Sequence, residues 1–229
     1  MFANRKDAGR QLAALLMHLK SEQPVVLALP RGGVPVAFEI ATALGAPLDF
    51  VLVRKIGVPW QPELAVAAVV NGDRPQIVEN EDVMRMLTIP EDFIQEEAKR
   101  QLQEIDRRRA LYLKDRARAD VKGCTAIVVD DGIATGATAR AALRAVRRTG
   151  PKRLVLAVAV APRTTVETLR AECDEVVCVA TPDDFGAISV FYADFQQVSD
   201  DEVVDLLQRA HEISTTERSR ADDGHPSPV

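Results

Sequence analysis

Residues 127–138 read IVVDDGIATGAT, and this stretch decides the fold. The apolar, β-branched residues 127–129 stop at two adjacent acids, Asp130 and Asp131, and a short loop of small residues follows. A helical pattern rich in Ala and Arg then runs through residues 139–148. Together these features predict a buried strand that ends in a turn and opens into a helix.

The predicted turn has the residue types that bind a phosphorylated sugar. A helix N-terminus offers free backbone N–H groups and the positive end of the helix dipole, which suit a phosphate. The small residues Ala134, Gly136 and Ala137 let the backbone close around the phosphate. The hydroxyls of Thr135 and Thr138 can donate hydrogen bonds to it. Asp130 and Asp131 can hold two neighbouring sugar hydroxyls. A plain strand–turn–helix would also contain Asp-Asp-Gly, but the complete pattern favours a ribose 5-phosphate site.

The stretch resembles the signature of type I phosphoribosyltransferases, which use phosphoribosyl pyrophosphate (PRPP). The resemblance implies that Asp130 and Asp131 bind the ribose hydroxyls, act in catalysis and face Mg²⁺, the implied cofactor. It also implies that residues 134–138 wrap the 5′-phosphate. Gly132 departs from the family, which more often has an aliphatic residue there.

Two basic segments follow the first two predicted strands. LPRGGVP places Arg31 beside Gly32 and Gly33, and VRKIGVP contains Arg54 and Lys55. The first resembles the family's pyrophosphate loop, and the second resembles the Arg-Lys-x-Gly segment of adenine and orotate phosphoribosyltransferases. The resemblance implies that these cations clamp pyrophosphate, with Lys55 a catalytic residue. The alternative for the first segment is a Gly-Gly turn with an Arg on the surface. The alternative for the second is two solvated charges at a strand end.

The segment from Gly57 to about Asp73 is predicted to be a mobile lid that excludes water from the site. It contains Trp60 and Glu63, and Glu63 could match a loop glutamate with a proton-transfer role in adenine-type enzymes, although a surface position is favoured. In a competing interpretation, residues 64–70 form a permanent strand that holds the segment rigid.

Near the C-terminus, ATPDDFGAISVFYADF resembles the acceptor-base segment of hypoxanthine-type phosphoribosyltransferases. The resemblance implies that Phe185 stacks on the acceptor base, and Asp194 matches a later acid only with one residue inserted. The alternative is a hydrophobic strand edge with the aromatic residues in the core.

Five continuous apolar runs predict strands at 25–29, 50–53, 125–129, 154–160 and 175–179. Helical patterns lie between most of them, at 36–43, 136–148 and 164–173. Strands that alternate with helices favour a parallel sheet with both faces covered. We therefore predict an α/β fold, a parallel sheet flanked by helices as in type I phosphoribosyltransferases, in one domain of residues 1–213.

Three segments complete the predicted organisation. Residues 57–120 form a loop and helical insertion, whose long charged helix begins near a capping-box pattern at 88–91. Residues 181–213 form a small hood and C-terminal segment. The tail from 214 to 229 lacks apolar periodicity and is predicted to be disordered.

Composition narrows the functional classes. The chain has 229 residues, of which 47% are hydrophobic and 28% charged, values typical of a soluble globular protein. Its net charge of −5 argues against a broad nucleic-acid-binding face. Three cysteines without metal-ligand spacing favour free thiols in a reducing cytoplasm. No stretch suits a membrane span, and a homodimer remains open.

The motifs together predict a phosphoribosyltransferase that uses PRPP and Mg²⁺ to transfer 5-phosphoribosyl to a small nitrogenous, base-like acceptor, releasing pyrophosphate. The alternative is a non-catalytic regulator that senses PRPP or a nucleotide on the same fold. Bacterial phosphoribosyltransferases of unassigned acceptor share the start of this chain, at Phe2, Arg5, Asp7, Ala8 and Gly9. The sequence does not identify the acceptor.

Overall fold

Five parallel strands form the central sheet in the computed structural model, which describes residues 1–58, 60–70, 76–87, 89–114 and 116–222. The strand order is β2-β1-β6-β7-β8, and every neighbouring pair is parallel. The strands are β1 (Val25–Ala28), β2 (Leu48–Phe50), β6 (Thr125–Asp130), β7 (Arg153–Val160) and β8 (Glu175–Ala180). The predicted α/β fold with a parallel sheet is therefore confirmed.

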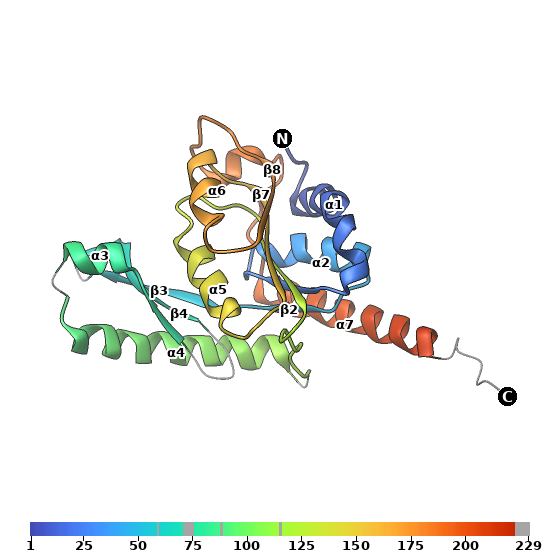
Figure 1. The fold of residues 1–229 in the computed structure, drawn as a ribbon, viewed down its shortest axis with the longest axis horizontal. Coiled ribbons are helices and arrows are strands. Elements are labelled where there is room, and N and C mark those ends of the chain that lie inside the picture. The colour runs from blue at the N-terminus through green and yellow to red at the C-terminus, as the bar shows by residue number, and fades with distance from the viewer. Residues whose placement is uncertain (59, 71–75, 88, 115, 223–229) are drawn as a thin grey trace.

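Helices cover both faces of this sheet (Figure 1), which explains why its strands are apolar without alternation. One face carries α1 (Arg5–Leu16), α2 (Gly33–Leu44) and α7 (Asp200–Asp222), and the other carries α5 (Ala137–Arg147) and α6 (Arg163–Leu169). Successive residues of a strand point to opposite faces of the sheet and so pack into two different hydrophobic cores. Ile127 and Val129 belong to the core under α1, α2 and α7, whereas Val128 belongs to the core under α5.

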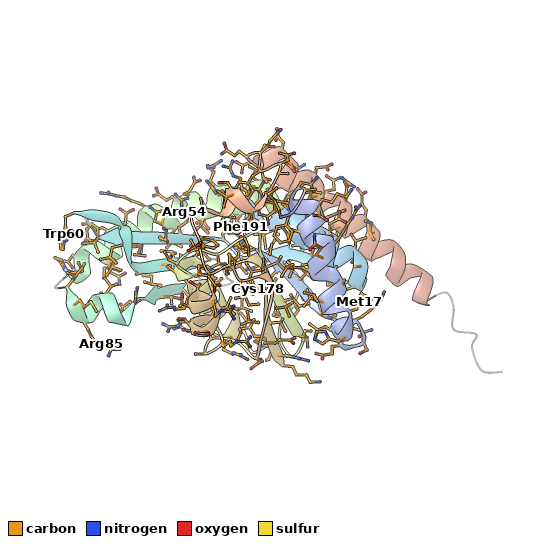
Figure 2. All side chains as sticks on the ribbon, turned by 90° about the horizontal axis from the view of Figure 1, so that it is seen from above. Met17, Arg54, Trp60, Arg85, Cys178 and Phe191 are labelled. Atoms are coloured by element: carbon orange, nitrogen blue, oxygen red, sulfur yellow. The ribbon has the colours of Figure 1, made fainter. Side chains whose placement is uncertain are left out.

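The insertion folds as an antiparallel ribbon of three strands, with α3 (Glu81–Met86) and α4 (Glu91–Leu113) after it. The strands are β3 (Val53–Val58), β4 (Gln61–Val70) and β5 (Gln76–Glu79). One face of the ribbon packs against α4 and the other against α5. Trp60 and Arg85 lie at its far end (Figure 2), and Trp60 is 64% exposed.

Three sequence-based boundaries need correction. The strand predicted at 50–53 falls across the junction between β2 and β3. Most of the segment predicted as a loop from Gly57 is strand, as the competing interpretation of residues 64–70 expected; Pro59 and residues 71–73 lie outside the described residues. Helix α7 continues to Asp222, so the disorder predicted from Ser214 is wrong for residues 214–222, and residues 223–229 lie outside the described part.

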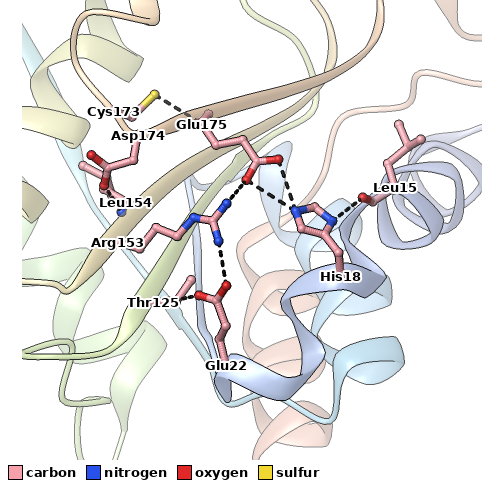
Figure 3. Close-up of polar contacts among 9 residues, drawn as sticks. All are labelled: Leu15, His18, Glu22, Thr125, Arg153, Leu154, Cys173, Asp174 and Glu175. Atoms are coloured by element: carbon pink, nitrogen blue, oxygen red, sulfur yellow. Dashed lines mark hydrogen bonds and ion pairs between the residues drawn. The ribbon is translucent and has the colours of Figure 1, made fainter.

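A polar network joins the amino ends of the parallel strands on the side opposite the predicted site (Figure 3). Arg153 of β7 donates to Glu22 at 2.6 Å and to Glu175 of β8 at 2.7 Å. Glu22 ends the 3₁₀ helix η1 (Met17–Glu22) and accepts from the Thr125 hydroxyl at 2.5 Å. The network therefore attaches η1, which follows α1, to three strands of the sheet.

Within the described residues, every helix is too short or too polar to cross a lipid bilayer.

Candidate functional site

A cavity of about 440 Å³ opens at the carboxyl ends of β1 and β6, the edge where parallel sheets bind ligands. The loop after β1 contributes Arg31 and Gly32, and the end of β6 contributes Asp130 and Asp131. The remaining walls come from the start of α1, the loops after β1 and β6, the start of α5 and the segment before α7: Arg5, Leu29, Pro30, Gly132, Thr138, Phe195, Gln197 and Val198. Five of the predicted site residues, with Thr138 among them, thus share one cavity.

Asp131 is fixed from three directions. Its Oδ2 atom accepts a hydrogen bond from Arg5 Nε at 2.6 Å, and its backbone oxygen accepts one from the Tyr192 hydroxyl at 2.5 Å. Gly32 leaves the space that the carboxylate fills, because a Cβ atom there would lie 2.1 Å from Oδ2. The carboxylate is therefore held in one orientation at the cavity wall.

Asp130 lies beside Asp131, and its Oδ1 atom accepts a hydrogen bond from the Asp131 backbone N–H at 2.9 Å. Burial raises the pKa of the Asp130 carboxyl well above its usual value, and the negative charge of Asp131 raises it further. A group that binds Asp130 through a hydroxyl donor or a nearby cation would stabilise its ionised form.

The predicted phosphate loop leads into α5. Gly136 has φ of +78°, in the left-handed region that favours glycine, and the helix begins at the next residue. The backbone is held in place by Thr165, whose hydroxyl donates to the Ala134 oxygen at 2.8 Å. The first turn of α5 contains no acid, so no carboxylate there competes for an anion.

Arg31 reaches the cavity from the loop that follows β1, and its contact with pyrophosphate stays a prediction. Its guanidinium lies 4.0 Å from Asp200 at the start of α7. Helix α2 begins at Gly33, two residues after Arg31. A Cβ atom at Gly33 would lie 2.6 Å from the Val129 oxygen. The two glycines therefore let this loop approach the end of β6 closely.

Arg54 and Lys55 do not form the two-residue clamp that the sequence predicted. They are consecutive in β3, and consecutive side chains of a strand point to opposite faces. Arg54 donates to Gln101 of α4 at 2.9 Å. Lys55 instead faces α5, where it lines a second cavity of about 230 Å³ with Thr135, Ala137 and Arg140.

This second cavity is rich in positive charge. Arg140 and Arg144 of α5 line it beside Lys55, and Glu79 is the acid in its wall. The Arg140 Nε atom is buried without a hydrogen-bond partner among the described residues. The phosphate loop lies between the two cavities, because Thr138 lines the first and Thr135 the second.

The predicted acceptor residue Phe185 does not line the cavity. Its ring stacks on Phe191, with 5.4 Å between ring centroids, and it packs against the hydrophobic core. Asp194 is exposed and accepts from the Gln196 backbone N–H at 3.3 Å. The aromatic ring at the cavity wall is Phe195, ten residues beyond the one predicted.

Arg5, Phe195 and Gln197 are cavity residues that sequence reasoning missed. Arg5 belongs to the Phe2–Gly9 pattern, which carried a family resemblance but no assigned role. Nothing in the chain around Phe195 distinguishes it from the three other aromatic residues of that segment. Trp60 lies far from the cavity at the end of the ribbon, and the Glu63 side chain lies outside the described residues.

The donor set suits a metal ion only together with a ligand. Within the described part of the chain, no three His, Cys, Asp or Glu side chains are grouped so that they could hold one. Mg²⁺ is commonly bound through one or two carboxylates plus substrate phosphates and water. Asp130 and Asp131 fit that arrangement, whereas a metal site built from protein ligands alone does not.

Residues 73–196 match the family model of the phosphoribosyl transferase domain. Two proteins of Mycobacterium tuberculosis, from strains H37Rv and CDC 1551, are each 48% identical over 211 residues, which is 92% of this chain. Their names assign them provisionally as phosphoribosyl transferases. The match covers 47% of each, so this chain spans about half the length of these curated relatives.

The crystal structure of TT1426 from Thermus thermophilus has the same fold. It is 43% identical in sequence, the superposition covers 91% of this chain and 98% of that one, and the TM-score is 0.81. The family model includes β6, the acids at its end and the phosphate loop that follows. Since the sequence similarity also extends over most of the chain, this protein belongs to the phosphoribosyl transferase family.

Proposed function

We propose that this protein transfers the 5-phosphoribosyl group of PRPP to a small nitrogenous, base-like acceptor and releases pyrophosphate, with Mg²⁺ as the metal. The observation that carries the proposal is the single cavity that joins Arg31, the acid pair Asp130 and Asp131, and Thr138 at the start of α5. A cation, a diol-binding acid pair and a helix N-terminus match pyrophosphate, ribose and 5′-phosphate in turn.

In the proposed reaction, the bond between the anomeric carbon and pyrophosphate breaks and a bond from that carbon to an acceptor nitrogen forms. The acceptor nitrogen loses its proton to water, and pyrophosphate takes the electron pair of the broken bond. Asp130 and Asp131 hold the ribose hydroxyls, and Arg31 stabilises the leaving charge. Lys55 adds positive charge beside the phosphate loop. Mg²⁺ would neutralise pyrophosphate oxygens. Catalysis then comes mainly from positioning and electrostatic stabilisation.

The test combines binding with turnover. Calorimetry should detect binding of PRPP with Mg²⁺ by the wild type, and Asp130→Asn with Asp131→Asn should abolish it without unfolding the protein. Incubation of PRPP with a panel of purine and pyrimidine bases should release pyrophosphate with one of them. Unchanged PRPP affinity in the double variant would overturn the proposed site. Tight binding without pyrophosphate release from any base would favour the regulatory alternative.

A further inference from the structure

The N-terminal arm, residues 2–4, lies against the wall of the cavity and leads directly into α1, which begins at Arg5. The Phe2 N–H donates to the Phe191 oxygen at 2.8 Å, and the Phe2 oxygen accepts from the Ala193 N–H at 2.8 Å. The Asp194 N–H donates to the Ala3 oxygen at 2.9 Å. These backbone bonds fix the arm against the segment that precedes α7. The buried Phe2 ring, which lies 5.2 Å from the Tyr192 ring between centroids, adds to them.

Arg5 extends from this fixed arm over the acid pair. Its Nε atom donates to Asp131 Oδ2 at 2.6 Å, and its Nη1 atom donates to the Gln196 oxygen at 2.7 Å. The guanidinium carbon lies 3.9 Å from the centroid of the Phe195 ring. Only 12% of the Arg5 side chain is exposed, so the plane of the guanidinium is held by three neighbours.

One end of this guanidinium remains available. Arg5 lines the cavity, and its Nη2 atom has no hydrogen-bond partner among the described residues. Phe195, Gln197 and Val198 also line the cavity, and the Phe195 ring lies directly against the Arg5 guanidinium. The function proposed above assigns the phosphates and the ribose of PRPP to Arg31, Thr138 and the acid pair, which leaves this wall for the acceptor.

We propose that Arg5 contacts the acceptor and selects one that presents a carbonyl or carboxylate oxygen to it. This inference rests on the function proposed above, because it concerns the acceptor part of the same cavity. A guanidinium donates hydrogen bonds and accepts none, so it stabilises an oxygen and repels an amino group placed at the same point. An acceptor that excludes water without supplying an oxygen leaves the Arg5 donor unpaired.

The alternative is that Arg5 only links the arm to Asp131. The two roles differ in what Arg5 should recognise. A structural link would affect every ligand of the cavity equally, because all of them depend on Asp131 or on the arm. A contact with the acceptor would affect ligands according to the group that faces Arg5.

Pairs of nucleoside 5′-monophosphates that differ in one group provide the probes. Inosine and adenosine 5′-monophosphate carry an oxygen or an amino group at one ring position, and uridine and cytidine 5′-monophosphate form the corresponding pyrimidine pair. Calorimetry should show that the wild type binds the oxygen-bearing member of at least one pair about tenfold more tightly or better. Ribose 5-phosphate, which lacks a base, measures the rest of the cavity.

In Arg5→Ala this preference should fall to less than about twofold, with a smaller change for ribose 5-phosphate. Arg5→Lys should keep part of it, because the charge remains but the planar donor group is lost. Arg10→Ala is the matched control: Arg10 belongs to the same helix, is exposed and pairs with Glu39 at 3.1 Å, so its loss should leave both quantities unchanged.

Three results would overturn the inference, and they are distinguishable. Ribose 5-phosphate binding without any preference in the wild type would refute the role of Arg5 and leave the proposed function standing. Equal losses for every ligand in Arg5→Ala, in a variant with an unchanged circular dichroism spectrum, would show a structural link. Failure of the wild type to bind PRPP, ribose 5-phosphate or any nucleotide would refute the proposed function as well.

Discussion

The Tyr112 hydroxyl donates a hydrogen bond to Asp200 Oδ1 at 2.5 Å, which joins the end of the inserted helix α4 to the start of α7. Tyr112 is 1% exposed, and its ring meets Phe50 of β2 edge to face with 5.6 Å between centroids. Burial and the Asp200 carboxylate raise the pKa of the Tyr112 hydroxyl. Since Asp200 also lies 4.0 Å from Arg31, the insertion is connected to the loop that lines the cavity.

We predict that Tyr112→Phe lowers stability and leaves ligand binding nearly unchanged. The variant keeps the ring in the core but deprives Asp200 of its donor, at a cost of about 1–2 kcal/mol. For a chain of this length that is a fall in Tm of about 2–8 °C, measurable by calorimetry. Tyr192→Phe is the comparison, because that hydroxyl donates to the Asp131 oxygen at 2.5 Å. We expect Tyr192→Phe to lose a similar amount of stability and, unlike Tyr112→Phe, to bind ribose 5-phosphate more weakly.

Lys55 and Arg54 should separate in their effects, although they are neighbours in the sequence. Lys55→Ala removes a positive charge from the cavity beside the phosphate loop and should weaken PRPP binding about fivefold or more. Arg54→Ala removes the hydrogen bond to Gln101 and should lower the Tm while changing the PRPP affinity less than twofold. Equal losses of affinity in the two variants would mean that β3 rearranges on binding and brings both cations to the ligand.

Gly32→Ala should weaken ribose 5-phosphate binding at least about tenfold. A Cβ atom at this position would lie 2.1 Å from Asp131 Oδ2, so the carboxylate must move away from Arg5 or the loop must shift. Overpacking of this kind costs about 1–3 kcal/mol of stability as well. Gly186→Ala is the control, since a Cβ there meets no atom within 4 Å. Full ligand affinity in Gly32→Ala would show that the orientation of Asp131 does not matter for the site.

Asp130→Asn should stabilise the protein at high pH. The pKa of Asp130 is raised above its ordinary value of 3.8, so the folded state favours the protonated carboxyl. Its contribution to stability is complete below that ordinary value and is lost as the pH rises through the raised pKa. Asparagine resembles the protonated form at every pH and still offers an acceptor to the Asp131 N–H.

We therefore expect Asp130→Asn to have a higher Tm than the wild type at pH 8. The difference should shrink as the pH approaches 4. Thermal unfolding of both proteins across this range is the measurement. Asp131→Asn should instead destabilise, because it breaks the ion pair with Arg5. A gain for Asp130→Asn that does not vary with pH would contradict the assigned titration.

The parallel sheet could be predicted because its strands are buried on both faces and are therefore continuous apolar runs. The boundaries of β6, β7 and β8 agree within one residue with the predicted strands. The prediction of one strand at residues 50–53 failed because the chain passes there from the parallel sheet into the ribbon. Only Val51 and Leu52 separate β2 from β3. One apolar run thus contains the end of one strand and the start of another.

The competing interpretation predicted a strand at residues 64–70, but the antiparallel pairing of the ribbon could not be predicted from local pattern. Residues 64–70, LAVAAVV, are apolar at every position because α4 covers one face and α5 the other. Neither helix is adjacent to this strand in the sequence, so the residues near it do not indicate that both faces of the strand are covered. The Gly and Pro residues near 57–62 indicated an interruption, and the structure places a hairpin connection there.

Their ligands stay predictions, but the acid pair, Arg31 and the predicted phosphate loop could be placed at one edge of the sheet, because each follows a strand and has few alternatives locally. Arg5 could not, because its partner Asp131 is 126 residues away. The prediction that Phe185 contacts the acceptor failed for a related reason. It was based on the distance of Phe185 from Pro182 in the sequence, whereas the fold determines which ring reaches the cavity. Phe185 finds a partner in Phe191, and Phe195 remains at the wall under Arg5.

The bridge between Phe2 and Tyr192 has a consequence for how the protein is made. The arm that carries Arg5 leaves the ribosome before any strand of the parallel sheet, yet its partners at 191–196 emerge only after all five strands. Closing so long a segment of chain must await the sheet that brings its ends together. During synthesis the cavity at the ends of β1 and β6 is therefore completed late, and a nascent chain that has already formed its sheet still lacks the wall that contains Arg5 and Phe195.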